Sequence, residues 1–186
     1  MSPSDDDIRF RGQEISQQLL IELEETRQAF HNLLEDVSES DYDKPSLNPE
    51  WSIGEMLYHI SLAPRVLPMD VRLIRYLKWV PKLPAGPFNR LNIYFTKRGG
   101  RNATKELLAA TYDKAHNETV KTLECVKDDE WSLGVEYPDW DPMLSGFITL
   151  ETLFHYIKRH FDSHEKDIRS ALGMDLDGAN SEQTHG

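Results

Sequence analysis

Apolar residues recur at helical spacing in four long stretches, and this periodicity constrains the fold more than any other feature of the chain. The stretches predict helices over residues 10–37, 52–63, 104–127 and 149–172. In the first, the apolar positions lie three or four residues apart or at sums of these: Ile15, Leu19, Leu23, Phe30, Leu33 and Val37. Each stripe has to be buried, and no convincing alternating strand pattern accompanies them. We therefore predict an all-α fold, a four-helix bundle.

Local signals mark the ends of two of these helices. Ser52 and Glu55, three residues apart, form a capping box, and Trp51 before them is positioned to close a hydrophobic staple. Pro64 is expected to end or kink that helix, because proline has no N–H to donate. Gly173 is expected to stop the last helix.

The remaining segments are expected to connect or flank the bundle. Residues 64–103 are too long for a tight turn and predict a crossover with one short helix, while residues 128–148, rich in Gly, Pro and aromatic residues, predict a loop. We expect a flexible N-terminal arm over residues 1–9, the bundle domain over 10–173 and a disordered tail over 174–186.

Composition narrows the range of functions. The 186 residues carry a formal net charge of −11, which argues against nucleic-acid binding because that binding relies on a basic surface. No apolar run approaches the ~20 residues of a membrane span, so no membrane partner is expected. The single cysteine, Cys125, cannot form an internal disulfide, and a cytoplasmic location fits it best. We expect Cys125 to be a small buried apolar group rather than a nucleophile.

One segment departs from the acidic average. Residues 65–101 contain nine basic residues and a single acid, Asp70, so the segment carries +8 and the remainder −19. These cations either pair with acids elsewhere or form a rim that attracts an anionic ligand. The sequence leaves both readings open, as it does for the aromatic residues of 131–148, which either pack over a bundle end or wall a substrate pocket.

Two histidines carry the clearest chemical signal. His160 and His164 lie four residues apart in a predicted helix and therefore share one face, one turn apart. His59 lies in another predicted helix, and if the two helices pack together, three imidazoles converge. Three protein ligands with an open position suit a catalytic divalent metal. The alternative is two solvated histidines and a third satisfied by a hydrogen bond in the core.

Other residues are weighed against this cluster. Glu55 lies one turn before His59 and is expected to be a cap, with an orienting hydrogen bond or a proton shuttle as alternatives. Asp167 lies one turn beyond His164 and could orient its imidazole. His155 is about 140° around the helix from His160, so it is excluded from the site.

With these residues, the chain resembles members of the DinB-like superfamily, which includes YfiT-type metal-dependent hydrolases. The resemblance rests on Trp51-Ser52-Ile53-Gly54-Glu55-Met56-Leu57-Tyr58-His59 and on His160-Phe161-Asp162-Ser163-His164, separated by ~100 residues, and it covers residues 10–173. It implies an up-down-down-up bundle with a long crossover between the second and third helices. It also implies a homodimer, and a nickel or zinc ion bound by His59, His160 and His164.

The resemblance further implies an enzyme that acts on small molecules. Related proteins are transferases or isomerases that use bacillithiol, mycothiol or glutathione, so we expect a thiol-dependent S-transferase acting on small electrophiles. A metal-dependent hydrolase and a non-catalytic bundle that binds a ligand or partner are the alternatives. Segments 64–103 and 131–148 depart from the family pattern, so the substrate is not carried over.

Overall fold

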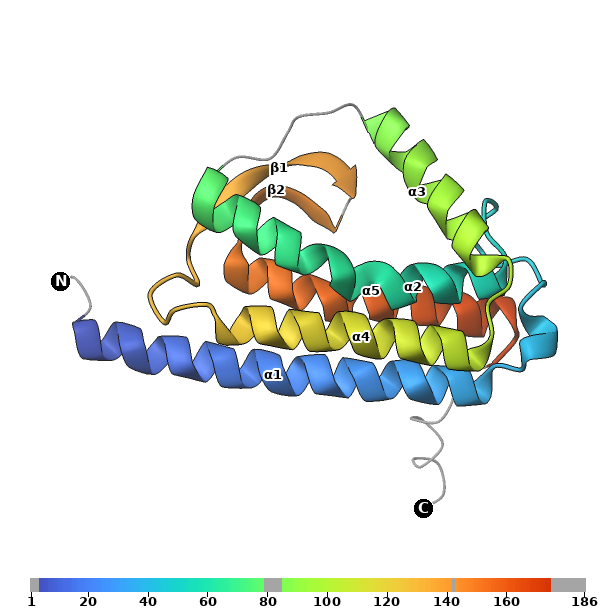
Figure 1. Cartoon of the computed structure of the whole chain (residues 1–186), viewed down its shortest axis with the longest axis horizontal. Coiled ribbons are helices and arrows are strands. Elements are labelled where there is room, and N and C mark those ends of the chain that lie inside the picture. The colour runs from blue at the N-terminus through green and yellow to red at the C-terminus, as the bar shows by residue number, and fades with distance from the viewer. Residues whose placement is uncertain (1–3, 79–84, 142, 175–186) are drawn as a thin grey trace, which may run out of the picture.

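Four long helices lie side by side and form the body of the protein (Figure 1). The computed structural model describes residues 4–78, 85–141 and 143–174. The four helices are α1 (Asp5–Asp36), α2 (Ile53–Arg72), α4 (Lys105–Glu124) and α5 (Leu150–Ala171). In Figure 1, α1 and α5 run from left to right, and α2 and α4 run from right to left. No helix among the described residues is long and apolar enough to cross a membrane.

The core between these helices has two parts. One part lies near the N-terminal end of α1 and includes residues that pack with the hairpin described below. Helix α2 contributes Leu67 and Val71 to it, and α5 contributes Phe154 and Ile157. Towards the other end, a second set packs around the stacked rings of Phe30 and Tyr112, and its largest members include Met56, Leu57, Ile60 and Phe161. The stripes predicted from the apolar spacing are thus the buried faces of the bundle.

The first helix begins earlier than the sequence predicted. Ser4 caps α1, its side chain accepting from the backbone of Asp7 while the Asp7 carboxylate accepts from the backbone of Ser4. The acidic run at residues 5–7 therefore stabilises a helix N-terminus, where negative charge is favourable. Residues 5–9 are helical, and this part of the predicted flexible arm is wrong.

The second helix continues through two prolines, so it does not end at Pro64, which was one of the two expected outcomes. Pro68 has no N–H to donate to the carbonyl of Pro64, one turn earlier. The hydroxyl of Thr119 in α4 donates to that carbonyl instead, at 2.8 Å, and the contact is buried. A hydrogen bond from a neighbouring helix thus replaces the one that proline removes, and α2 remains helical to Arg72.

Beyond Arg72 the crossover is more helical than predicted. A π-helical turn, Leu73–Leu77, extends α2 and ends at Lys78, which adopts a left-handed conformation with φ 51°. A further helix, α3 (Ala85–Gly100), then projects from the bundle (Figure 1). Its C-terminal end lies close to α2, because a Cβ on Gly100 would approach the Cα of Glu55 to 2.7 Å. Residues 79–84 lie outside the described part of the chain.

Residues 134–149 form a β-hairpin, so both the predicted loop and the strictly all-α fold are wrong. Strands β1 (Gly134–Asp141) and β2 (Leu144–Thr149) pair antiparallel, with Val135 opposite Ile148. Val135 and Tyr137 are buried while Glu136 between them is exposed, which is the strand alternation. The pairing is irregular between Tyr137 and Asp141, a stretch that contains a proline. The regular alternation covers only a few residues before the proline, and the segment is rich in glycine and proline, so the sequence pattern indicated a loop.

The last two long helices agree with the sequence. Thr104 caps α4 and Thr149 caps α5, and Gly173 follows α5 with φ 64° as expected for a glycine stop. Cys125, at the C-terminal end of α4, is exposed, so the expectation that it is buried is wrong. The predicted tail lies outside the described residues from 175 onward.

The Thr119 contact predicts a stability difference. Thr119→Val keeps the side-chain shape but leaves the buried carbonyl of Pro64 without a donor. It should lower the free energy of unfolding by about 1–3 kcal/mol, measured by urea denaturation. Thr122→Val is the matched control in the same helix, since its hydroxyl donates to the exposed Glu118 carbonyl of its own helix. Equal effects of the two substitutions would contradict this account of α2.

Candidate metal centre

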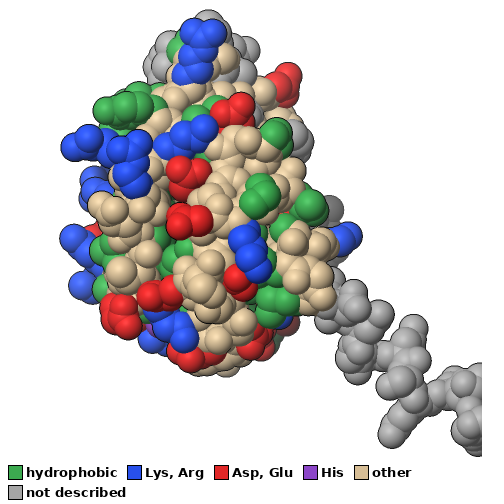
Figure 2. Space-filling view, turned by 90° about the vertical axis from the view of Figure 1, so that its right-hand side faces the viewer, with side chains coloured by type: hydrophobic (Ala, Val, Ile, Leu, Met, Phe, Trp, Pro, Cys, Tyr) green, Lys and Arg blue, Asp and Glu red, His purple; other side chains and the backbone are tan. Residues whose placement is uncertain are grey.

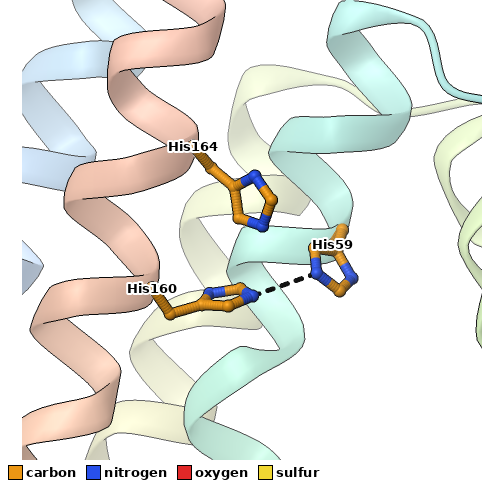
Figure 3. A group of neighbouring side chains, drawn as sticks. All are labelled: His59, His160 and His164. Atoms are coloured by element: carbon orange, nitrogen blue, oxygen red, sulfur yellow. Dashed lines mark hydrogen bonds between the residues drawn. The ribbon is translucent and has the colours of Figure 1, made fainter. Parts of the chain in front are cut away.

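Two helices bring the three predicted histidines together. His59 lies in α2, and His160 and His164 lie one turn apart on the face of α5 that packs against α2. Figure 3 shows the three rings pointing into the space between the two helices. The convergence that the sequence predicted only on condition of helix packing is therefore present.

The imidazoles lie close enough to share one ion. The Nε2 atoms of His59 and His160 are 3.1 Å apart. One ring nitrogen from each of the three histidines lies within 4.8 Å of the others. The ring centroid of His59 lies 5.0 Å from that of His160 and 5.2 Å from that of His164. Among the described residues, this is the one group of three or more His, Cys, Asp or Glu side chains with such spacing.

Burial keeps these rings neutral. His160 is only 3% exposed, while His59 and His164 are half-buried. Burial lowers the pKa of His59 to about 3, with the neighbouring His164 adding to the effect. Burial also lowers the pKa of His160, well below its ordinary value, and that of His164. A neutral imidazole has a free lone pair, so burial holds the cluster in the form that binds metal.

The nitrogen geometry fits a divalent cation. Imidazole nitrogens at about 2.0–2.1 Å from a tetrahedral zinc ion lie roughly 3.3 Å from one another. The 3.1 Å between His59 and His160 is close to that value, and His164 needs only a small ring movement to join them. The donor set of three neutral nitrogens suits borderline metals such as zinc or nickel.

Aromatic rings surround the cluster. The indole of Trp51 packs on His59, with ring centroids 4.5 Å apart, and also lies near His164. Tyr156, one turn before His160, packs against that ring at 5.3 Å. Its hydroxyl donates to the carboxylate of Asp141 in the hairpin at 2.6 Å. Tyr156 and Asp141 were not among the residues predicted from the sequence. The signal available was the four-residue spacing from Tyr156 to His160 and His164.

The two acids proposed to orient the histidines play different roles. Glu55 accepts from the backbone of Ser52 at 3.0 Å, which is the predicted capping box. Asp167 lies 3.9 Å from Nδ1 of His164, too long for a hydrogen bond. The Nδ1 atoms of His160 and His164 are buried and make no hydrogen bond to a described residue. The orienting role thus remains a prediction for Asp167, while Glu55 serves the helix.

The residues set aside from the site lie elsewhere. His155 contacts Glu22 of α1 at 2.9 Å, on another face of α5. Arg75 of the basic segment forms a two-pronged ion pair with Glu130, at 3.1 and 2.9 Å. Arg75 therefore pairs with an acid elsewhere in the chain, which is the first of the two alternatives for the basic segment, and does not form a rim for an anionic ligand. Trp131 and Tyr137 of the aromatic segment are buried in the core. For these two residues, the alternative of packing over the bundle holds rather than that of lining a substrate pocket.

The described part of the chain has surface hollows in addition to the histidine cluster. Two of them, of about 370 and 440 Å³, lie between α1 and α5 and share Glu22 and Lys158 in their walls. Neither is lined by a member of the cluster. The candidate site is defined here by its converging nitrogens.

Fold and site together define a helical-bundle protein with a buried tri-histidine cluster between two of its helices. The family model of the DinB superfamily matches residues 22–165, so the chain belongs to the DinB superfamily. No curated protein matches the sequence.

Solved structures share this fold. YfiT from Bacillus subtilis, described as a probable metal-dependent hydrolase with an unusual four-helix bundle topology, is similar with a TM-score of 0.64 and 16% identity, over 94% of this chain and 92% of that one. A mycothiol-dependent maleylpyruvate isomerase is similar with a TM-score of 0.63 and 12% identity, over 82% of this chain. The match spans 60% of the isomerase chain. At these identities the likeness establishes the fold.

The lowered histidine pKa values predict how the metal-free protein responds to acid. In the unfolded chain these histidines take up protons below their ordinary pKa of 6.5, whereas in the folded protein their lowered pKa values shift protonation to lower pH. Stability should therefore be highest above pH 6.5 and fall as the pH drops below it, by about 2 kcal/mol at pH 5 for each histidine that stays neutral.

The measurement is urea denaturation at neutral and acidic pH in the presence of a chelator. The control is the His59→Gln/His160→Gln/His164→Gln variant, which lacks the titrating groups and should lose much less stability on acidification. If the variant and the parent lose stability equally, the cluster is not the source of the pH dependence.

Proposed function

We propose that this chain is a metal-dependent enzyme that transfers a low-molecular-weight thiol to small electrophiles, with His59, His160 and His164 as the metal ligands. The observation that carries the proposal is the convergence of three neutral imidazole nitrogens within 4.8 Å in a protein of the DinB superfamily. The two similar structures are described as mycothiol-dependent and as probably metal-dependent, which supports the same two components.

The roles of the protein's own residues follow from their positions. His160, almost fully buried, and His59 and His164, half-buried, would hold the ion from two helices, so the site depends on α2 and α5 staying in register. Trp51 covers His59 and limits the access of water to it. When bound, a divalent metal supplies positive charge that lowers the pKa of a thiol or a water molecule beside it.

Tyr156 and Asp141 lie next to the site in positions that favour substrate contact. Asp141 also accepts from the backbone of Met143, so its carboxylate is held by two donors, Tyr156 and this amide. The Asp141 carboxylate is separated from His160 by the ring of Tyr156. A carboxylate fixed in this position is suited to accept a hydrogen bond from a small substrate. We assign these residues to binding and orientation.

The second candidate is a metal-dependent hydrolase. It is favoured by the similarity to YfiT, which extends over nearly the whole of both chains. The same three histidines would serve, and water would replace the thiol. A non-catalytic bundle that binds a ligand is the third reading, and it predicts no turnover with either nucleophile.

Several finer features belong to this proposal. They are nickel or zinc as the metal, a homodimer, a cytoplasmic location, a small-molecule substrate without nucleic acid, and the up-down-down-up order of the family. The thiol, whether bacillithiol, mycothiol or glutathione, is a matter for the experiments below.

The ligand assignment predicts which substitutions remove the metal. The parent protein should bind about one zinc or nickel ion per chain, and His160→Ala or His164→Ala should reduce this to near zero because two ligands no longer hold the ion. His155→Ala is the matched control on the same helix, and it should retain the metal. Elemental analysis after dialysis gives the stoichiometry, and loss of metal in the His155 variant alone would overturn the assignment.

The choice between transferase and hydrolase predicts a dependence on thiol. The metal-loaded protein should turn over an activated electrophile, such as a halogenated nitrobenzene, only when bacillithiol, mycothiol or glutathione is added. After the uncatalysed rate is subtracted, the thiol-dependent rate of the His59→Ala variant should be at least about a hundredfold lower than that of the parent. Ester or amide hydrolysis without any thiol would favour the hydrolase instead.

A further inference from the structure

The projecting helix α3 carries an exposed apolar stripe. Leu91, Tyr94 and Phe95 are 54%, 58% and 54% exposed, and their spacing of three and four residues places them on one face. The opposite face, with Thr96 and Gly100, is buried against the bundle. A stripe of large apolar side chains directed away from the core is unusual for a helix of a globular domain.

The surrounding segment extends this apolar character. Of the twelve large hydrophobic residues that are exposed in the described chain, seven fall within residues 65–101. In addition to the three on α3, these include Met69 near the end of α2, and Tyr76 and Leu77 in the π-helical turn, which lie at the other end of α2 from the end that contacts α3 (Figure 1). One fifth of the chain thus holds more than half of its exposed large apolar groups.

Positive charge accompanies the apolar stripe. Arg98 lies on the exposed face of α3, one turn beyond Tyr94 and Phe95, and Arg90 lies at the edge of the same face. Both are exposed, as are Arg72 and Arg101, and no acid among the described residues lies within ion-pair distance of any of these four. Figure 2 shows Lys and Arg side chains beside hydrophobic ones in the upper part of the molecule, the height at which α3 lies in Figure 1.

The combination indicates an anionic and partly apolar partner. A second copy that used the same face would bring the unpaired arginines of two chains together, because a twofold interface is built from the same patch on both subunits. Tyr94 and Phe95 have faces on which nucleic-acid bases can stack, but aliphatic Leu91 does not, whereas an apolar lipid layer accommodates all three side chains. A helix with aromatic and aliphatic groups on one side and arginines around them has the character of helices that lie in a lipid interface.

We propose that the exposed face of α3 docks on an anionic lipid surface, with Leu91, Tyr94 and Phe95 entering the headgroup layer and the arginines contacting lipid phosphates. The overall charge of −11 does not prevent this, because salt screens charges beyond about 8 Å and only the local basic face is sensed. The proposal revises the expectation of no membrane partner, which rested on the absence of a spanning segment. Peripheral docking requires no such segment.

The orientation of α3 is compatible with docking. Its C-terminal end is seated on α2, where a Cβ on Gly99 would overlap the ring of Tyr58 and one on Gly100 would meet Glu55. These contacts fix one end of the helix beside the turn that carries His59, while the rest of α3 projects outward (Figure 1).

The test is co-sedimentation of the full-length protein with vesicles of phosphatidylcholine, alone or mixed with phosphatidylglycerol. Binding should occur only to the mixed vesicles and should weaken as salt is raised. Leu91→Ser/Phe95→Ser should weaken it about tenfold or more, and Arg90→Gln/Arg98→Gln should do the same. All four positions are exposed, so circular dichroism should show the parent fold in both variants.

Matched controls lie on α4, outside the segment. Leu107→Ser removes another exposed leucine and Lys114→Gln/Lys121→Gln removes two exposed cations, and neither should alter vesicle binding. The proposal is overturned if no vesicle is bound, if both vesicle types bind equally, or if the α3 variants bind like the parent. Sedimentation velocity adds a further outcome. A parent dimer that Leu91→Ser/Phe95→Ser converts to a monomer, without vesicle binding, would assign this face to a second copy of the chain instead.

Discussion

The burial of neutral imidazoles between α2 and α5 is the constraint on which the rest of the molecule depends. Charged rings at this spacing would repel one another and lose their hydration, so the folded state keeps them neutral. That arrangement exists only while His59 faces His160 and His164. The two helices must therefore hold their relative position along their whole length, and much of the remaining structure contributes to this.

The supporting contacts come from elements outside the α2–α5 pair. Thr119 of α4 satisfies the carbonyl that Pro68 leaves free, which allows α2 to continue from the turn of His59 to the buried residues Leu67 and Val71. The hairpin lies beside α5 and reaches Tyr156 through Asp141. Trp51, just before α2, packs on His59. Three parts of the chain outside the two helices, namely α4, the hairpin and Trp51, thus support the arrangement.

The basic segment divides into two kinds of cation. Arg75 is held by Glu130 and stabilises the junction between the π-helical turn and the segment after α4. The arginines of α3 lie instead among exposed apolar side chains on a helix that projects from the bundle. An acidic protein thus keeps a basic and apolar helix at its periphery and a charge-free cluster at its centre. The two features are structurally separate, although both involve the first turns of α2.

The sequence by itself determined the features that depend on local periodicity and capping. These are the four long helices, the capping box of Ser52 and Glu55, and the preference for His160 and His164 over His155, since helical phase is a property of spacing alone. Tertiary structure decided the rest. Whether α2 continues past Pro68 depends on the hydroxyl of Thr119 in another helix, and whether residues 134–149 form strands depends on the core that buries Val135 and Tyr137. The proximity of Asp141 to Tyr156 follows from that hairpin. Such contacts join residues far apart in the chain, and no local pattern encodes them.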